Sequence, residues 1–132
     1  MGVRLYRTAA GLRALVTSEP VEPNSARAAD LLRRFNADPA YARLCDRQNS
    51  FRARVTPKPW RCQCERPPSR YPWADDQQEA AYRAWELAYH EKSRGWSACE
   101  LVATLGVSRV HPRIQPVIEF HDALGCTGGR LA

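Results

Sequence analysis

Alternating apolar and polar residues predict two strands at the start of the chain. Residues 3–8 form a short β-tolerant run, and in residues 12–17 the apolar Leu12, Ala14 and Val16 alternate with Arg13, Leu15 and Thr17. Gly11 lies between the two runs and suits a tight turn. The pattern predicts a β-hairpin.

Two helices are expected next, each marked by a capping residue. Asn24 or Ser25 can cap the first, in which apolar residues recur at helical spacing: Ala28, Leu31, Leu32 and Phe35. Asp38 followed by Pro39 indicates the start of a second.

A third alternating segment covers residues 51–56. Phe51, Ala53 and Val55 would share one face of a strand, and Arg52 and Arg54 would point to the other. Five prolines between residues 57 and 72 end the pattern, so we expect a packed loop there.

The C-terminal half is dominated by helical patterns. Asp75 and Gln78 resemble a capping box ahead of a helix over residues 76–94, and a second apolar stripe runs from Ile114 to Leu124. Residues 97–105 fit either a buried strand or a helix. Residues 100–110 also resemble part of a helix-turn-helix, although Pro112 and Pro116 interrupt the expected recognition helix.

The element order predicts an α+β protein. We expect a three- or four-stranded, mostly antiparallel sheet with helices on one face, with a ferredoxin-like arrangement as the leading topology. Residues 1–132 should form a single domain. The expected core comprises Leu5, Val16, Leu31, Leu32, Phe35, Leu44, Phe51, Val55, Trp85, Tyr89, Ile114, Val117 and Ile118.

Charge divides the chain into a basic half and a near-neutral, helical half. The 132 residues carry a net charge of +6. Residues 1–70 contain fourteen Lys and Arg against six Asp and Glu, and residues 71–132 contain six against eight. The asymmetry indicates an anionic partner. The same arginine content would also follow from GC-rich codon usage.

The basic residues suggest where an anionic partner would bind. If the three strands share a sheet, the face opposite Leu5, Leu12 and Val16 gathers arginines with an aromatic ring, and the loop after residue 56 adds a tryptophan between cations. Arginine pairs with phosphate and aromatic rings stack on unpaired bases. The predicted nucleic-acid-binding residues are Arg4, Tyr6, Arg13, Arg52, Arg54, Lys58, Trp60 and Arg61. A solvated sheet face and a buried Trp60 are the alternatives.

The sequence assigns no catalytic residue, metal or cofactor. Cys62 and Cys64 could supply two metal ligands, completed by Cys45, Cys99 or His90, but their spacing is shorter than zinc sites use. His111, His121 and Asp122 could form an acid–base set, although His121 lies on an apolar stripe, where a hydrogen-bonded core histidine is commoner. No phosphate-binding glycine motif is present.

Five cysteines and the absence of long apolar runs bear on location. The odd cysteine count argues against a disulfide framework. No apolar run is long enough for a membrane span, and residues 1–5 lack a signal-peptide core. We therefore expect a cytoplasmic protein with reduced thiols.

Two segments resemble an uncharacterised family of small bacterial proteins. They are Tyr6–Arg13 and Ser50–Arg61, with similar residues again at His111-Pro112 and 119–122. The resemblance spans most of the chain, carries no known activity and favours a strand at 97–105.

The Tyr-x-Thr-x-x-Gly hairpin is also similar to that of primase-polymerase folds. Their paired metal-binding aspartates have no counterpart here, since Asp75 and Asp76 are adjacent.

Together these features favour a nucleic-acid-binding module for single-stranded nucleic acid or RNA. The first alternative is a protein-interaction or assembly subunit that binds an acidic partner. The second is an enzyme with a His/Cys or zinc site.

Overall fold

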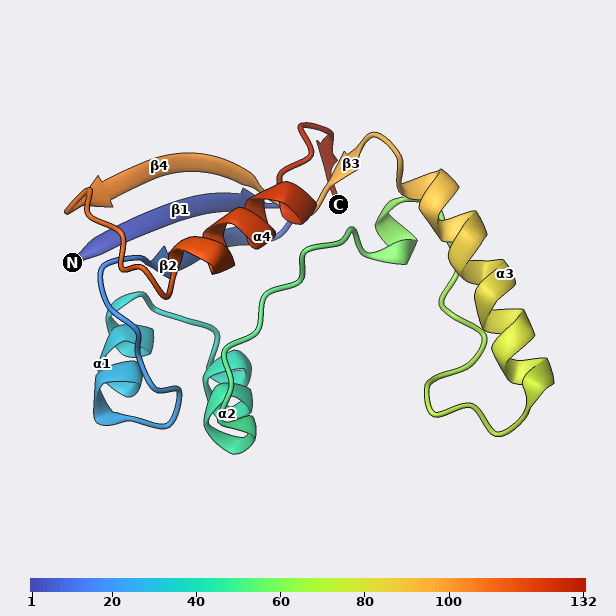
Figure 1. Cartoon of the computed structure of the whole chain (residues 1–132), viewed down its shortest axis with the longest axis horizontal. Helices are drawn as coiled ribbons and strands as arrows, with labels where there is room; N and C mark the ends of the chain where they lie inside the picture. Colours follow the sequence, from blue (N-terminus) through green and yellow to red (C-terminus); the bar gives the residue numbers. More distant parts are fainter.

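The centre of the fold is a three-stranded antiparallel sheet in the order β2-β1-β4 (Figure 1). The computed structural model describes all residues 1–132. The sheet strands are β1 (Gly2–Thr8), β2 (Gly11–Val16) and β4 (Glu100–Gly106). A separate parallel pair joins β3 (Trp96–Ser97) to β5 (Arg130–Leu131). The α+β class is confirmed, with three sheet strands rather than the four of a ferredoxin-like arrangement.

The predicted hairpin is present, and Ala9 and Ala10 form its two-residue turn. Thr8 lies opposite Gly11, and the register continues to Val3 opposite Val16. Strand β4 then pairs with the other edge of β1, with a bulge that shifts the register between Leu5 and Tyr6. The ambiguous segment at 97–105 is therefore mainly strand, and the helix-turn-helix alternative is wrong.

The chain has four helices, and three of them begin at capping residues that the sequence indicated. The four helices are α1 (Ala26–Arg34), α2 (Pro39–Gln48), α3 (Asp76–Ser93) and α4 (Gln115–Gly125). Ser25, Asp38 and Asp75 accept hydrogen bonds from the first-turn N–H groups of their helices, as N-caps do. Pro116 lies in the first turn of α4, where it costs no helical hydrogen bond.

The strand expected at 51–56 is absent, and this prediction is wrong. Residues 51–58 run as irregular chain, followed by a short 3-10 helix at Pro59–Arg61. The segment pairs with neither edge strand of the sheet, and the carbonyl oxygen of Arg54 accepts a hydrogen bond from the Arg13 guanidinium instead of from a strand neighbour. Alternation alone cannot make a strand without a partner for its backbone groups.

The sheet is covered on the face opposite to the one expected. Helix α4 lies against the side that carries Arg4 and Tyr6 (Figure 1), since Asp122 of α4 bonds to both. Much of the apolar side remains open, with Leu12 68% and Leu105 52% exposed, although Val3 on the same side is buried. The choice of Leu5, Leu12 and Val16 as the helix-covered face is therefore wrong.

The core is small and differs from the expected set. Leu31, Tyr89 and Ile118 are buried as predicted. Four predicted core residues are exposed instead: Phe35, Leu44, Phe51 and Val117. Many buried positions are small or polar, among them Ala28, Cys45, Thr17 and Ser97. No helix combines the length and the apolar character that crossing a membrane requires.

Candidate functional site

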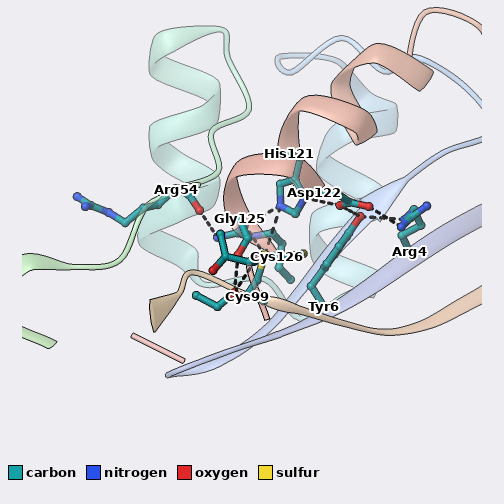
Figure 2. Close-up of polar contacts among 11 residues, drawn as sticks. Arg4, Tyr6, Arg54, Cys99, His121, Asp122, Gly125 and Cys126 are labelled. Atoms are coloured by element: carbon teal, nitrogen blue, oxygen red, sulfur yellow. Dashed lines mark hydrogen bonds and ion pairs between the residues drawn. The ribbon is translucent and has the colours of Figure 1, made fainter. Parts of the chain in front are cut away.

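The carboxylate of Asp122 is the centre of a polar network between α4 and the sheet. Its Oδ2 accepts a hydrogen bond from Arg4 at 2.6 Å, and its Oδ1 accepts one from the Tyr6 hydroxyl at 2.8 Å (Figure 2). The Nδ1 of His121 lies 2.9 Å from the same Oδ1. Three groups from two elements thus converge on one carboxylate, which fixes α4 over β1.

This network removes Arg4 and Tyr6 from the predicted binding face. Tyr6 is fully buried, and Arg4 pairs with Asp122. Burial, and then the hydrogen bond to Asp122, raise the pKa of the Tyr6 hydroxyl well above its ordinary value. The expectation that this face is open to solvent is wrong, because α4 supplies an acidic partner that no local pattern revealed.

The network also orients the imidazole of His121. A proton on Nδ1 is donated to the Asp122 carboxylate, which leaves Nε2 as an acceptor. Arg13 donates to this nitrogen over 2.7 Å, and the Sγ of Cys99 lies 3.8 Å from it. The prediction of a hydrogen-bonded core histidine is confirmed, and Asp122 is its partner.

Two thiols lie beside His121. The Sγ atoms of Cys99 and Cys126 are 3.5 Å apart, and neither cysteine is in a disulfide. Burial, and then the neighbouring Cys99 thiol, raise the pKa of the Cys126 thiol to about 12. The ligand atoms of Cys99, His121 and Cys126 lie within 4.8 Å of one another. They are the only three such residues in the chain arranged closely enough to hold a metal ion.

Cys62 and Cys64, the pair considered from the sequence, lie in a different place. They are buried with Tyr89 in an apolar cluster against Trp85 and Trp96. The Cys62 thiol donates to the carbonyl oxygen of Pro59, and burial raises its pKa. This pair packs the loop against α3 and does not contribute to the three-residue group.

A cationic pocket lies on the other side of Arg13. It has a volume of about 180 Å³, and four of the ten residues that line it are Arg13, Arg54, Lys58 and Arg61. Thr8 and Thr56 also line it, and no Asp or Glu side chain does. None of the four cations forms an ion pair, and together with the two threonines they make a site suited to an anion with several oxygens.

The loop of residues 51–70, here called the cationic loop, continues this character. It carries six Lys and Arg against one acidic residue, Glu65. None of the six forms an ion pair, whereas seven arginines elsewhere do. Trp60 of this loop is 56% exposed, with Lys58 Nζ 5.4 Å and Arg66 Cζ 5.8 Å from its ring centroid.

The structure thus brings together about half of the predicted binding residues. Arg13, Arg54, Lys58 and Arg61 share the pocket. Arg52 and Trp60 are exposed on the same loop but do not line it. Arg4 and Tyr6 belong to the network beneath α4.

A larger pocket of about 410 Å³ separates α1 from α2. Its charged lining residues are Arg33, which pairs with Asp30, and Asp46. Its one hydroxyl, that of Ser25, caps α1, and its two charges are of opposite sign, so the smaller pocket is the better candidate site.

Sequence reasoning missed the grouping of Cys99, His121 and Cys126. Cys99 lies between β3 and β4, His121 lies within α4, and Cys126 directly follows that helix, so no short spacing motif marks the set. The one local indication of this group is the adjacent pair His121 and Asp122, which the sequence analysis interprets with His111 as a possible acid–base set. His111 lies in the turn before α4, where its Nδ1 accepts from the Arg113 N–H.

Comparisons with known proteins identify no relative of this chain. No protein-family model matches the chain, and no curated protein or solved structure is similar enough to count as a match.

Proposed function

We propose that the chain binds single-stranded nucleic acid through the cationic loop and the pocket beside it. The observation that carries the proposal is the pocket of four cations with no acidic lining residue. Such a pocket has positive charge left over for phosphate groups, because none of its four cations forms an ion pair.

Trp60 supports a single strand over a duplex. Its ring is largely exposed, with the cationic groups of Lys58 and Arg66 5.4 Å and 5.8 Å from its centroid. An unpaired base can stack on such a ring while its phosphates meet the neighbouring cations, whereas the bases of a duplex are already stacked. The arrangement suits contacts to backbone and base faces, which carry little sequence preference.

The test is fluorescence anisotropy with a labelled single-stranded oligonucleotide across a range of salt concentrations. Native protein should bind at low salt and weaken as salt rises. The triple variant Arg54→Ala, Lys58→Ala, Arg61→Ala should bind more weakly. Its log–log salt slope should be lower by about 2, since each lost phosphate contact removes about 0.7.

A matched variant separates a specific site from net charge. Arg27→Ala, Arg33→Ala, Arg83→Ala removes the same charge from arginines that already pair with Glu19, Asp30 and two glutamates of α3. This control should keep nearly native binding. Equal losses in both triples, or no binding by native protein at low salt, would rule out the proposed site.

Replacement of Trp60 addresses the stacking contact. Trp60→Ala should weaken binding by about 1–3 kcal/mol with little change in salt slope, and Trp60→Phe should restore part of the loss. A duplex bound as tightly as the single strand, with Trp60→Ala without effect, would contradict the single-strand preference.

A second candidate function, an assembly subunit, is favoured by the exposed surface. The 15.0 kDa chain has 9179 Å² of accessible surface, against roughly 7,000 Å² for a folded monomer of this mass. The excess exceeds the area of about 800 Å² that each partner buries in a standard interface. The open apolar sheet face around Leu12 and Leu105 would meet a second copy of the chain.

Size-exclusion chromatography with light scattering tests this candidate. Native protein should elute as a dimer, and Leu12→Lys with Leu105→Lys should convert it to a monomer. A native monomer at micromolar concentration would exclude the assembly function and leave nucleic-acid binding unaffected.

A further inference from the structure

Three soft donor atoms converge beneath α4, apart from the proposed nucleic-acid contacts. They are the Sγ atoms of Cys99 and Cys126 and the Nε2 of His121, all within 4.8 Å of one another. Two thiolates and an imidazole are a ligand set that zinc uses, and thiolates select against magnesium and calcium. We propose that Cys99, His121 and Cys126 bind one Zn²⁺ ion.

The separations of the donors suit tetrahedral coordination. Zinc–sulfur bonds of about 2.3 Å and zinc–nitrogen bonds of about 2.0 Å place tetrahedral ligand atoms about 3.5–3.8 Å apart. The two Sγ atoms are 3.5 Å apart, and the Sγ of Cys99 is 3.8 Å from Nε2 of His121. The thiols need only small movements to share an ion.

The groups behind His121 are those that a zinc ligand requires. A metal-binding imidazole donates its other ring N–H to a carboxylate or carbonyl, which directs the free nitrogen at the metal. Here Nδ1 of His121 lies 2.9 Å from Asp122, whose carboxylate is held in turn by Tyr6 and Arg4 (Figure 2). The orientation of the ring is therefore fixed from the sheet.

The backbone holds the two cysteine segments together without a metal. The N–H of Cys99 donates to the carbonyl oxygen of Gly125 at 3.0 Å, and the hydroxyl of Ser97 lies 2.8 Å from the same oxygen. The N–H of Thr127 donates to Ser97 Oγ. A side chain at position 125 would place its Cβ 3.2 Å from the Cys99 sulfur, so glycine keeps the approach open.

The charge balance follows from the donors present. Binding releases one proton from each thiol, and the two thiolates neutralise the two charges of the ion. Arg13 now donates to Nε2 of His121 and lies 3.6 Å from the Cys99 sulfur, so a cation already occupies this position. Zinc binding would displace this guanidinium toward the pocket that Arg13 also lines.

Three protein ligands leave a fourth position for water, as in zinc sites that perform chemistry.

The first experiment measures bound zinc by elemental analysis after purification in reducing buffer with zinc and dialysis against zinc-free buffer. Native protein should retain about one zinc per chain, and Cys99→Ser and Cys126→Ser should each retain less than about one tenth. The control is Cys62→Ser with Cys64→Ser, which should retain the ion. A native content below about one tenth, or loss of zinc in the control alone, overturns the proposal.

Cobalt titration of the native chain provides a readout that does not depend on a variant folding. Co²⁺ bound by two thiolates and an imidazole should give a thiolate charge-transfer band and the visible bands of a tetrahedral site, and added zinc should remove both. His121→Gln should weaken the bands while its far-ultraviolet circular dichroism stays native. Absence of the charge-transfer band in reduced native protein, or an unchanged spectrum in His121→Gln, would show that this group holds no metal.

Discussion

The arginines beneath α4 and those of the cationic loop looked alike in sequence, yet their surroundings differ. Arg4 is paired with Asp122 at 2.6 Å and is mostly covered. Arg52 and Arg54 are exposed and have no acidic partner. The difference shows that a basic pattern along the chain leaves unpaired positive charge only where the fold supplies no carboxylate opposite it. Arg13 lies between the two groups and contacts both His121 and Arg54.

The largest effect is expected from Asp122→Ala. The substitution leaves Arg4, Tyr6 and His121 without their shared acceptor in a site that is mostly buried, so the free energy of unfolding should fall by about 3 kcal/mol. Urea denaturation measures it. Glu119→Ala, on the same helix but exposed, should change stability by less than about 0.5 kcal/mol. Equal effects of the two substitutions would mean that the network does not hold α4.

Tyr6→Phe should have a smaller effect on the same network. It removes the hydroxyl that donates to Asp122 and accepts from Arg4 Nε at 2.9 Å, but keeps the buried ring. We expect a loss of about 1 kcal/mol, measured by urea denaturation. Tyr71→Phe, at an exposed position, serves as the control and should be neutral. A neutral Tyr6→Phe would show that the hydroxyl contributes only to the position of Asp122.

Alkaline pH tests how the cationic loop is anchored. The Tyr89 hydroxyl donates to the carbonyl oxygen of Pro57 at 2.7 Å, and burial raises the pKa of this phenol above 10.0. The folded protein therefore keeps a proton that the unfolded chain releases above about pH 10, so stability should fall as pH rises through that range. Unfolding free energies measured from pH 8 to 11 should decline less steeply in Tyr89→Phe. An identical decline would show that other groups account for it.

The smallest effect is expected from Arg52→Ala with Arg54→Ala. Both side chains are exposed and unpaired, so stability should change by less than about 0.5 kcal/mol. Arg4→Ala should cost about 2 kcal/mol, because it breaks the pair with Asp122. Thermal or urea unfolding of the two variants compares the regions directly. If the double variant lost as much free energy of unfolding as Arg4→Ala, the two groups of arginines would not differ in their contribution to stability.

Four residues of the candidate site were named from the sequence, but the arrangement expected for them was different. Arg13, Arg54, Lys58 and Arg61 were chosen as parts of a sheet face and an adjoining loop, and they meet instead around one pocket. The sequence could single out these cations because positive charge with few acidic neighbours can be read along the chain. The error lay in treating 51–56 as a strand, since alternation does not show whether a segment will pair with the sheet.

Sequence by itself determined the local elements of this protein. Ser25, Asp38 and Asp75 begin helices because their side chains accept first-turn N–H groups, and Gly11 ends a two-residue hairpin turn. These features depend on residues a few positions apart, so they can be read along the chain.

Only the tertiary structure decided which sheet face is covered and which thiols meet. Asp122 joins α4 to Arg4 across 118 positions, and Cys126 reaches Cys99 across 27. Hydrophobic alternation favoured burial of the Leu12 face, but the carboxylate of Asp122 bonds to two groups of the other face and fixes α4 there. Contacts between groups so distant in sequence depend on how whole elements pack, and no local pattern encodes that.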